Sequence, residues 1–503
     1  MRLSSSLVAM NNLEPRQPLP AVILAAGEGG RLWLAAGKPK PLVELVGLTL
    51  AERTVAQLRL AGISRFIVVL GFEADRVRRQ FERIAHARHC SIDFVVARDW
   101  KKGNGASAAA AASLVGDSPF LLTMVDHIVS LAAVERLLAS PPSPGHIKLA
   151  VDFAKESVFD LDDATKVRLA DDRITAIGKD LSAYDALDTG LFYCTPALFS
   201  AIRRGAANGR HSLSAGISEC IRKQRMDAVD VTGHPWIDVD TPEAHSEAKR
   251  RIEAGLGKST EDGFVARALN RPISARLSRL LLRTRLTPNQ VTVMGFSLAM
   301  MAAAALATAH AGWWIAAGVL IQMASIVDGC DGEIARAKLL HSNRGAWLDT
   351  LLDRYSDIAI GVAITFAAHS LLPSPWIWPI GTLAIISFLM ASYVTKEYQL
   401  RFGRAFPDTF ANRLKRRDLR LLILAVGAVL GYPFVGLIVV GAMTHGVIVF
   451  LIASTWQQES GRFARTIWAP LGADPQASQP AGLVEVVASA APSPDPQPLA
   501  VHP

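Results

Sequence analysis

Cysteine and charge are both scarce in this chain of 503 residues. Its 4 cysteines form no CxxC pair, so no disulfide framework is indicated and a reducing cytoplasm is the simpler environment. The first 20 residues contain no continuous apolar run of the kind that a secretory signal requires. Only 19% of the residues are charged and 50% are hydrophobic, which excludes a disordered or fibrous protein and is too apolar for an ordinary soluble enzyme.

The charge is also unevenly distributed along the chain. Residues 1–260 carry 33 Lys and Arg against 30 Asp and Glu, whereas residues 261–503 carry 20 against 15. The second part is therefore charge-poor and basic. This balance is typical of a membrane domain with cytoplasmic Lys and Arg, and it does not favour a nucleic-acid partner.

The first part of the chain is predicted to be an α/β domain over 19–254. Short apolar runs alternate there with amphipathic segments, which predicts a Rossmann-like, mostly parallel sheet covered by helices. We expect strands at 21–26, 66–70, 94–97 and 120–125, and helices at 50–61 and 74–84. Residues 1–18 and 468–503 are predicted to be disordered, and the small polar run 255–263 to be a linker.

The second part is predicted to be an all-α membrane domain over 286–457. It is preceded by a basic amphipathic segment, 264–285, which either lies along a membrane surface or packs as a solvated helix on the neighbouring domain. About six transmembrane helices are expected, at 290–308, 312–330, 347–368, 374–395, 419–432 and 434–455. Lys and Arg occur in alternate loops only, so the positive-inside rule places the first domain and both termini in the cytoplasm.

The first motif with chemical meaning follows the strand predicted at 21–26. The run LAAGEGGRL (24–32) places Gly27 and Gly29 where backbone N–H groups can approach a triphosphate that Arg31 would neutralise. Lys40 stands between two prolines in KPKPL (38–42), and a charge restrained in this way suits the stabilisation of phosphoryl transfer. Together these runs resemble the LAAGxGxRL…PKPL signature of the sugar-phosphate nucleotidyltransferase family.

This resemblance extends over residues 20–250 and implies further roles. Asn104 and Ser107 would contact the nucleotide base. Lys179, which follows an Ile-Gly pair, would approach the substrate phosphate. Thr189 and Gly190 would lie in the pocket for the acceptor.

The same resemblance implies a magnesium site held by two carboxylates. Asp126 ends an apolar strand in MVDH, where the family places one metal-binding aspartate. The second is assigned to Asp240 in WIDVDTPE, with Asp238 as the alternative. Two carboxylates and several retained waters are a normal arrangement for this hard cation. Asp240 also precedes a Thr-Pro pair and would equally suit a helix cap.

A second motif lies beside the apolar segments. Asp328 and Asp331 are spaced i,i+3 and Asp349 and Asp353 are spaced i,i+4, so each pair shares one face of a helix. A carboxylate beside an apolar segment is costly unless it is paired or bound to metal, so the four should converge on cations. The full pattern, D-x2-D-G-x2-A-R-x8-G-x3-D-x3-D, resembles the CDP-alcohol phosphotransferase family at every fixed position.

This second resemblance also implies roles. Asp328, Asp331 and Asp349 would hold two divalent metals, and Asp353 beside them would deprotonate the acceptor hydroxyl. Contacts with the cytidine nucleotide are implied for Gly332, Ala335 and Arg336.

A phosphorylated acceptor would need a cationic pocket in this second domain. Arg417 and Arg420 in the basic run 413–420 would supply it, although plain positive-inside charge explains that run equally well.

The two resemblances join an enzyme that makes nucleoside-diphosphate alcohols to one that consumes CDP-alcohols, which selects CTP as the nucleotide. Such fusions resemble bifunctional enzymes that make CDP-inositol from CTP and inositol 1-phosphate and then pass phosphoinositol to a second inositol 1-phosphate. The alternative is another alcohol phosphate with a lipid acceptor, hence phospholipid synthesis. Mg²⁺ or Mn²⁺ is expected in both domains, and a homodimer through the membrane domain is expected in the lipid bilayer of the cell membrane.

Overall fold

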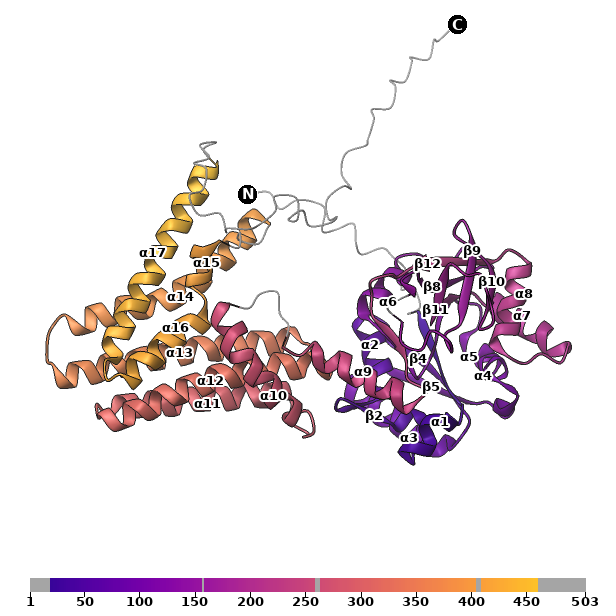
Figure 1. Cartoon of the computed structure of the whole chain (residues 1–503), viewed down its shortest axis with the longest axis horizontal. Coiled ribbons are helices and arrows are strands. Elements are labelled where there is room, and N and C mark those ends of the chain that lie inside the picture. Colours follow the sequence, from indigo (N-terminus) through magenta and orange to yellow (C-terminus); the bar gives the residue numbers. More distant parts are fainter. Residues whose placement is uncertain (1–18, 156–157, 258–262, 404–408, 460–503) are drawn as a thin grey trace, which may run out of the picture.

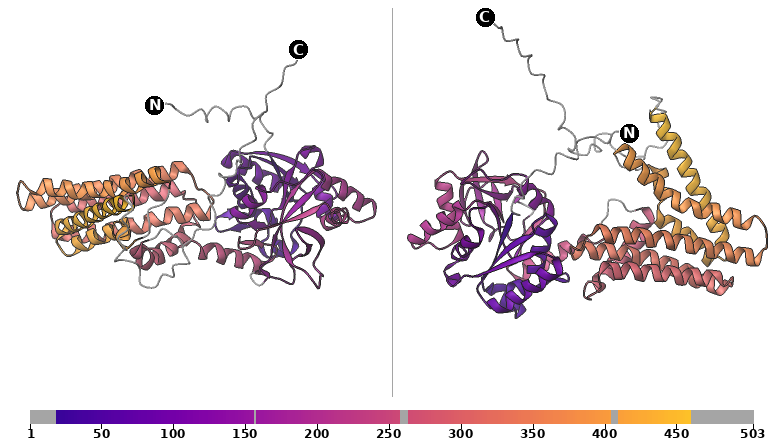
Figure 2. Two further views of the ribbon diagram at one scale, coloured as in Figure 1. Left: turned by 90° about the horizontal axis from the view of Figure 1, so that it is seen from above. Right: turned by 180° about the vertical axis from the view of Figure 1, so that it is seen from behind.

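A computed structural model describes residues 19–155, 158–257, 263–403 and 409–459 of the chain (Figure 1). An α/β domain and a helical domain lie side by side, as both views of Figure 2 show. The two ends predicted to be disordered, 1–18 and 468–503, and residues 258–262 of the predicted linker lie outside the described residues.

The α/β domain is built on a sheet of nine strands in the order β5-β4-β1-β6-β11-β8-β12-β10-β9. Their bounds are Pro20–Ala25 (β1), Arg65–Leu70 (β4), Ser91–Val96 (β5), Phe120–Met124 (β6), Ile147–Asp152 (β8), Lys166–Ala170 (β9), Arg173–Gly178 (β10), Ala186–Cys194 (β11) and Met226–Asp230 (β12). The four strands predicted from apolar runs are β1, β4, β5 and β6, and they pair in parallel. Their existence is confirmed.

The sheet as a whole is mixed, so the prediction of a mostly parallel sheet is wrong. Strand β11 runs antiparallel to both β6 and β8, and β10 runs antiparallel to β12 and β9. Two residues separate β9 from β10, and so short a connection permits only an antiparallel hairpin. Strands β8 and β12 pair in parallel, so the second half of the sheet contains both parallel and antiparallel pairs.

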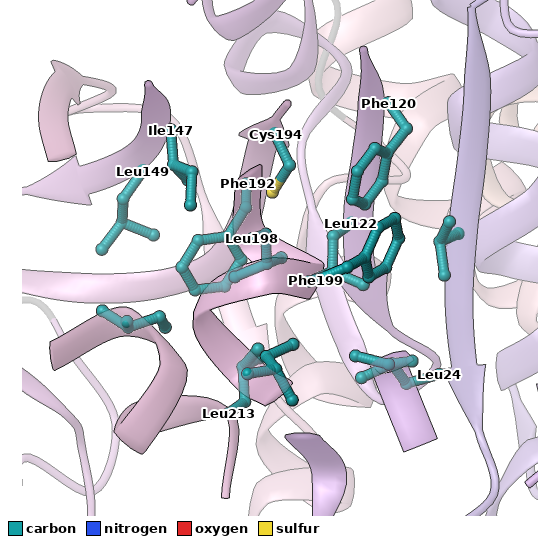
Figure 3. Packing of buried hydrophobic residues seen from close by; sticks show 14 of the residues in the cluster. Leu24, Phe120, Leu122, Ile147, Leu149, Phe192, Cys194, Leu198, Phe199 and Leu213 are labelled. Atoms are coloured by element: carbon teal, nitrogen blue, oxygen red, sulfur yellow. The ribbon is translucent and has the colours of Figure 1, made fainter. Parts of the chain in front are cut away.

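Helices cover both faces of this sheet. Their bounds are Gly30–Ala36 (α1), Leu50–Leu60 (α2), Ala74–Arg88 (α3), Asn104–Ala110 (α4), Ala112–Val115 (α5), Leu131–Leu138 (α6), Ala197–Ala207 (α7), Leu213–Arg222 (α8) and Pro242–Ala254 (α9). Helices α4, α5, α7 and α8 pack on one face, where the rings of Phe120 and Phe199 stack with centroids 4.9 Å apart (Figure 3). Helices α2, α3 and α6 pack on the other face around Phe66 and Phe81. Both predicted helices are confirmed as α2 and α3.

Two small antiparallel sheets stand apart from the main one and position functional side chains. Strands β2 (Glu44–Leu45) and β3 (Leu48–Thr49) form a hairpin directly after the short 3₁₀ helix η2 (Lys40–Leu42). Strands β7 (His127–Val129) and β13 (Trp236–Asp238) pair so that Asp238 lies opposite His127. The segment after β6 and a segment more than 100 residues later are thereby joined.

The helical domain begins with a π-helical turn, η5 (Ala266–Asn270), and continues with eight α-helices in the described residues. Their bounds are Arg271–Leu281 (α10), Pro288–Ala307 (α11), Ala311–Ala337 (α12), Asn343–Leu371 (α13), Ile377–Phe402 (α14), Phe410–Leu414 (α15), Arg417–Val429 (α16) and Pro433–Glu459 (α17). Each of the six apolar segments predicted from the sequence corresponds to one of these helices. Thr287 caps α11, with Pro288 in its first turn and Gln290 completing a capping box.

Four of the described helices are long and apolar enough to cross a membrane: α11, α12, α14 and α17. Helix α13 carries several charged side chains in its first half, and α16 has 13 residues, fewer than the ~20 that a straight crossing needs. Helix α12 has 27 residues and is therefore about 40 Å long. Its C-terminal turns carry the second motif.

Candidate active sites

The glycine-rich loop after β1 and the helix η2 meet at one end of the sheet. Gly29 has a φ of +64°, and a Cβ at that position would lie 2.8 Å from the Cβ of Lys40, so glycine lets the two segments pass this closely. Lys40 is 8% exposed, and its ammonium group pairs with the carboxylate of Asp126 after β6. The two residues predicted from separate motifs are thus in direct contact.

His127 connects Asp126 to Asp238. Its Nδ1 lies 3.0 Å from Asp126 Oδ1, and its Nε2 lies 3.8 Å from Asp238 Oδ2. Burial opposes the charged form, but Asp238 and Asp126 raise the pKa of His127 to about 9. Burial alone would raise the pKa of Asp126, but Lys40 and His127 hold that pKa well below its usual range. The cluster therefore contains ionised carboxylate and two cationic side chains at neutral pH.

The same cluster has the donors of a metal site. Ligand atoms of Asp126, His127 and Asp238 all lie within 4.8 Å of one another. Burial and the neighbouring carboxylates of Asp126 and Asp240 raise the pKa of Asp238 to about 6, against the opposing effect of His127. Within the described part of the chain, Asp238 Oδ1 is buried without a hydrogen-bond partner, so the carboxylates of Asp126 and Asp238 fit a hard cation. Asp240, the sequence-based assignment, instead pairs with Arg31.

Asp163 joins the two cations that the sequence assigns to substrate phosphates. Its carboxylate lies 2.9 Å from Nη2 of Arg31 and 2.5 Å from Nζ of Lys179. Hydrogen bonds from Lys179 and Arg31 lower the pKa of Asp163, although burial partly opposes them. This network borders a cavity of about 240 Å³ whose lining includes Asn104, His127, Asp163, Lys179, Asp188 and Asp238.

Other predicted residues of the first domain build the walls of this cavity. Oδ1 of Asn104 accepts a hydrogen bond of 2.9 Å from the backbone N–H of Leu213, which ties α4 to α8. Ser107 is buried. The hydroxyl of Thr189 donates to the Ala150 carbonyl at 2.9 Å. Gly190 has a φ of +75°, and a Cβ there would collide with the ring of His127.

In the helical domain, α12 and α13 bring three of the four predicted aspartates together. Ligand atoms of Asp328, Asp349 and Asp353 lie within 4.8 Å of one another. The carboxylate of Asp331, one turn along α12, accepts a hydrogen bond of 2.6 Å from Oγ1 of Thr292. Oδ1 of Asp349 is buried and has no hydrogen-bond partner among the described residues. An orphaned carboxylate oxygen beside other carboxylates fits a divalent cation.

Arg417, at the start of α16, reaches into this group of aspartates. Its Nη1 lies 2.8 Å from Asp353 Oδ1 and 3.2 Å from Asp328 Oδ2, and its Nε donates to Asp357 at 3.0 Å. Arg420 instead lies behind the site, 3.8 Å from Asp357 and above the ring of Phe388. The two arginines predicted as a pair therefore have different surroundings.

The part of the motif that the family resemblance implies for nucleotide contact occupies the last turns of α12. The backbone N–H of Gly332 donates to Asp331, and a Cβ on Gly332 would lie 3.4 Å from Nη1 of Arg336. Ala335 is half-buried. Nη2 of Arg336 donates to the carbonyl of Leu256 at 3.1 Å, so the chain just after α9 contacts this motif directly.

Several residues of both sites have no assigned role in the sequence-based reading. His127 stands next to the predicted Asp126, and that position was its only signal. Asp163 and Asp357 have no local signal at all. Glu333 lies inside the second motif, is fully buried, and pairs with Arg271 of α10 at 3.0 Å.

A polar pocket of about 260 Å³ adjoins Asp328 between α10 and α16. Its lining includes Asn270, Arg271, Ser274, Asp328, Arg416 and Arg417. The basic amphipathic segment predicted at 264–285 thereby supplies one wall of the second site.

Comparisons with known proteins agree with this division. Residues 21–159 match the model of the MobA-like NTP transferase domain, and residues 285–453 match that of the CDP-alcohol phosphatidyltransferase family. The molecule is therefore a transferase with a nucleotidyltransferase domain followed by a CDP-alcohol phosphotransferase domain.

Relatives that span most of the chain identify the family more narrowly. The bifunctional IPC transferase and DIPP synthase of Rubrobacter xylanophilus is 38% identical over 85% of this chain and 94% of its own length. The protein of the same name from Thermococcus kodakarensis is 36% identical over 81% of this chain and 89% of its own length. The chain belongs to the family of bifunctional IPC transferases and DIPP synthases.

One solved structure similar to the first domain is that of the inositol-1-phosphate CTP transferase from T. maritima. It is 24% identical, covers 46% of this chain and 97% of that chain, and superposes with a TM-score of 0.41.

Proposed function

We propose that this chain makes CDP-inositol from CTP and inositol 1-phosphate in its first domain and consumes it in its second. The second reaction would transfer phosphoinositol to another inositol 1-phosphate and release CMP. The observation that carries the proposal is that a chain of this family holds two groups of metal-ligand side chains, one in each domain. Both would hold Mg²⁺, whose chemistry is to neutralise phosphate charge and polarise the phosphoryl group under attack.

In the first domain, a phosphate oxygen of inositol 1-phosphate would attack the α-phosphorus of CTP and pyrophosphate would leave. Lys40 is buried and held by Asp126, so its charge is fixed before the substrate arrives. Arg31 would neutralise the departing phosphates, and Lys179 would hold the incoming one. Both must leave Asp163 to do so, because that carboxylate pairs with both of them.

In the second domain, a hydroxyl of the acceptor would attack the inositol-bearing phosphorus of CDP-inositol, and CMP would leave. Asp353 would accept the hydroxyl proton. Its carboxylate is held in place by Arg417, whose Nη1 lies 2.8 Å from Asp353 Oδ1. Asp328, Asp331 and Asp349 would hold the metals, with Thr292 orienting Asp331 by its hydrogen bond.

The polar pocket beside Asp328 supports a phosphorylated polyol as the acceptor rather than a lipid. It is small, about 260 Å³, and its walls carry Arg271, Arg416 and Arg417. A diacylglycerol-type acceptor would need an apolar approach to Asp328. An anionic acceptor instead matches these guanidinium groups.

The helical domain is proposed to cross the membrane six times, with α13 and α16 completing the four longer apolar spans. The distribution of Lys and Arg supports a cytoplasmic position for the α/β domain and both termini. The apolar side chains of Phe264, Ile273 and Leu280 are exposed and suit a membrane surface. A homodimer through the helical domain remains a prediction, which cross-linking in membranes would test.

The deciding experiment supplies the purified full chain with CTP, Mg²⁺ and a panel of alcohol phosphates, and identifies products by mass. CDP-inositol, pyrophosphate, CMP and the inositol phosphodiester are expected, and Lys40→Ala or Asp126→Ala should abolish pyrophosphate release. A clear preference for UTP over CTP, or a product only with diacylglycerol-type acceptors, would contradict the proposal.

A further inference from the structure

The helix that carries the second motif ends in an unusual way. After α12, the N–H of Leu340 donates to the carbonyl of Ala335 at 2.9 Å, and the N–H of Leu339 donates to that of Arg336 at 3.3 Å. These two bonds form a Schellman motif, which normally has glycine at its left-handed residue. Here that residue is Leu339, with a φ of +51°. A branched side chain disfavours this conformation, so the surroundings must hold it.

The Schellman motif leaves three carbonyls at this helix end without a partner inside α12: those of Ala337, Lys338 and Leu339. All three are bound by the α/β domain. Arg53 of α2 donates to Ala337 O at 3.1 Å. Arg88 in the last turn of α3 donates to Lys338 O at 3.0 Å and to Leu339 O at 2.7 Å. Orphan carbonyls and the negative end of a helix dipole both favour such cations.

These two arginines are built into the fold of the α/β domain. Arg53 is 4% exposed and also donates to the carbonyl of Leu45 in the β2–β3 hairpin at 2.8 Å. The turn of that hairpin touches the helical domain as well, because a Cβ on Gly47 would lie 2.9 Å from the carbonyl of Leu282. The hairpin follows directly after η2, which carries Lys40. The contact between the two domains therefore connects the segment that follows Lys40 in the first site to the end of α12, which carries the second motif.

The helix end held in this way belongs to the catalytic motif. Arg336 lies one residue before Ala337, and Asp331 lies less than two turns earlier on the same helix. Nζ of Lys338 donates to the carbonyls of Thr284 and Leu286 at 3.0 Å each, which ties the same helix end to the chain leading into α11. A shift of this helix end would move the nucleotide contacts relative to Asp349 and Asp353 on α13.

We infer that Arg53 and Arg88 are positioning residues for the second reaction, so that the CMP-releasing site depends on the α/β domain docked against the end of α12. The inference rests on the proposed function for the identity of the second reaction. It assigns the first domain a role beyond supplying CDP-inositol: it caps the catalytic helix of the enzyme that follows it.

The test uses the full chain in detergent and supplies both substrates of the second reaction, CDP-inositol and inositol 1-phosphate. In Arg88→Ala, kcat for CMP release should fall by about 10- to 100-fold, the size expected for a misplaced catalytic group. Pyrophosphate release from CTP and inositol 1-phosphate should persist, since Arg88 lies outside the first site. Arg88→Lys keeps a cation at the helix end and should restore part of the loss. Arg83→Ala, an exposed arginine of the same helix α3, is the matched control.

Hydrogen exchange of the amides of 335–342 measures the docking without any substrate. Exchange there should accelerate in Arg88→Ala and not in Arg83→Ala. Unchanged exchange and unchanged CMP release in Arg88→Ala would overturn the inference, as would an equal loss in Arg83→Ala. If the wild-type chain released no CMP from CDP-inositol, the proposed function would fail, and the exchange comparison would still decide the docking.

Discussion

The two carboxylate clusters of this chain are proposed to serve related phosphate chemistry, but their negative charges are balanced in different ways. In the α/β domain, Asp126 is in contact with Lys40 and His127, both cationic and both part of the same domain. In the helical domain, Arg417 is the cation that contacts both Asp328 and Asp353, and one oxygen of Asp349 has no partner among the described residues. The negative charge of the first cluster is balanced largely by side chains of its own domain, whereas the second cluster is expected to depend more strongly on bound metal.

The clusters also differ in how the backbone assembles them. Asp126 and Asp238 come from segments more than 100 residues apart and meet because β7 pairs with β13. Asp328 and Asp331, like Asp349 and Asp353, are neighbours on the turns of single helices. A sheet-built site is therefore sensitive to strand register, and a helix-built site to the relative position of two helices.

The largest effect that separates the two sites is expected from Asp353→Asn. Loss of a general base typically costs ~10²–10⁴-fold in rate, and added metal should not restore it. Because the first site is untouched, CDP-inositol should accumulate when membranes carrying the variant receive CTP and inositol 1-phosphate. Quantifying CDP-inositol against the diester measures this. Normal diester formation with no intermediate would remove Asp353 from the mechanism.

Asp349→Asn sharpens the claim that the second cluster depends on metal. It removes a proposed ligand, so CMP release should fall by at least about 10- to 100-fold, with partial recovery at high Mg²⁺ or Mn²⁺. Titrating the metal at fixed CDP-inositol gives the apparent metal affinity for the variant and the wild type. Asp353→Asn serves as the comparison that metal does not rescue. A loss in Asp349→Asn that is equally insensitive to metal would count against a ligand role.

In the first cluster, the positive charge of His127 balances the neighbouring carboxylates, so the stability of the domain should depend on pH. The pKa of His127 is raised to about 9 from an ordinary value near 6.5, so its stabilising effect is complete below about pH 6.5 and disappears as the pH rises through 9. At low pH this effect is on the order of 3 kcal/mol. Thermal unfolding of the metal-free chain should show His127→Asn well below wild type at pH 6.5 and close to it at pH 10. A constant difference would contradict a charged His127.

The smallest effect is expected from Asp163→Asn, because its ion pairs are largely exposed and each is worth ~1 kcal/mol or less. Removing this internal anion should lower KM for CTP and inositol 1-phosphate by less than about 5-fold, most clearly at low salt. Asp162→Asn, the exposed neighbouring residue, is the matched control. An increase in both KM values would instead indicate that Asp163 positions Arg31 and Lys179.

What the sequence alone determined is local in character. The loop LAAGEGGRL, the restrained Lys40 and the spacing of the four aspartates could be read directly, because turns, strands and helix faces repeat over a few residues. The first four strands and the helices α2 and α3 followed from apolar periodicity for the same reason. The expectation of a mostly parallel sheet failed in the second half of the domain, where β10 and β11 run antiparallel to their neighbours.

Only the tertiary structure decided which distant residues meet. It placed Asp238 rather than Asp240 beside Asp126, brought Arg417 but not Arg420 among the aspartates, and joined Arg53 and Arg88 to the end of α12. Each of these contacts joins segments that no short motif spans. In the sequence, each Asp or Arg has many possible partners of opposite charge. Packing of the sheet and helices decides which of these partners it meets.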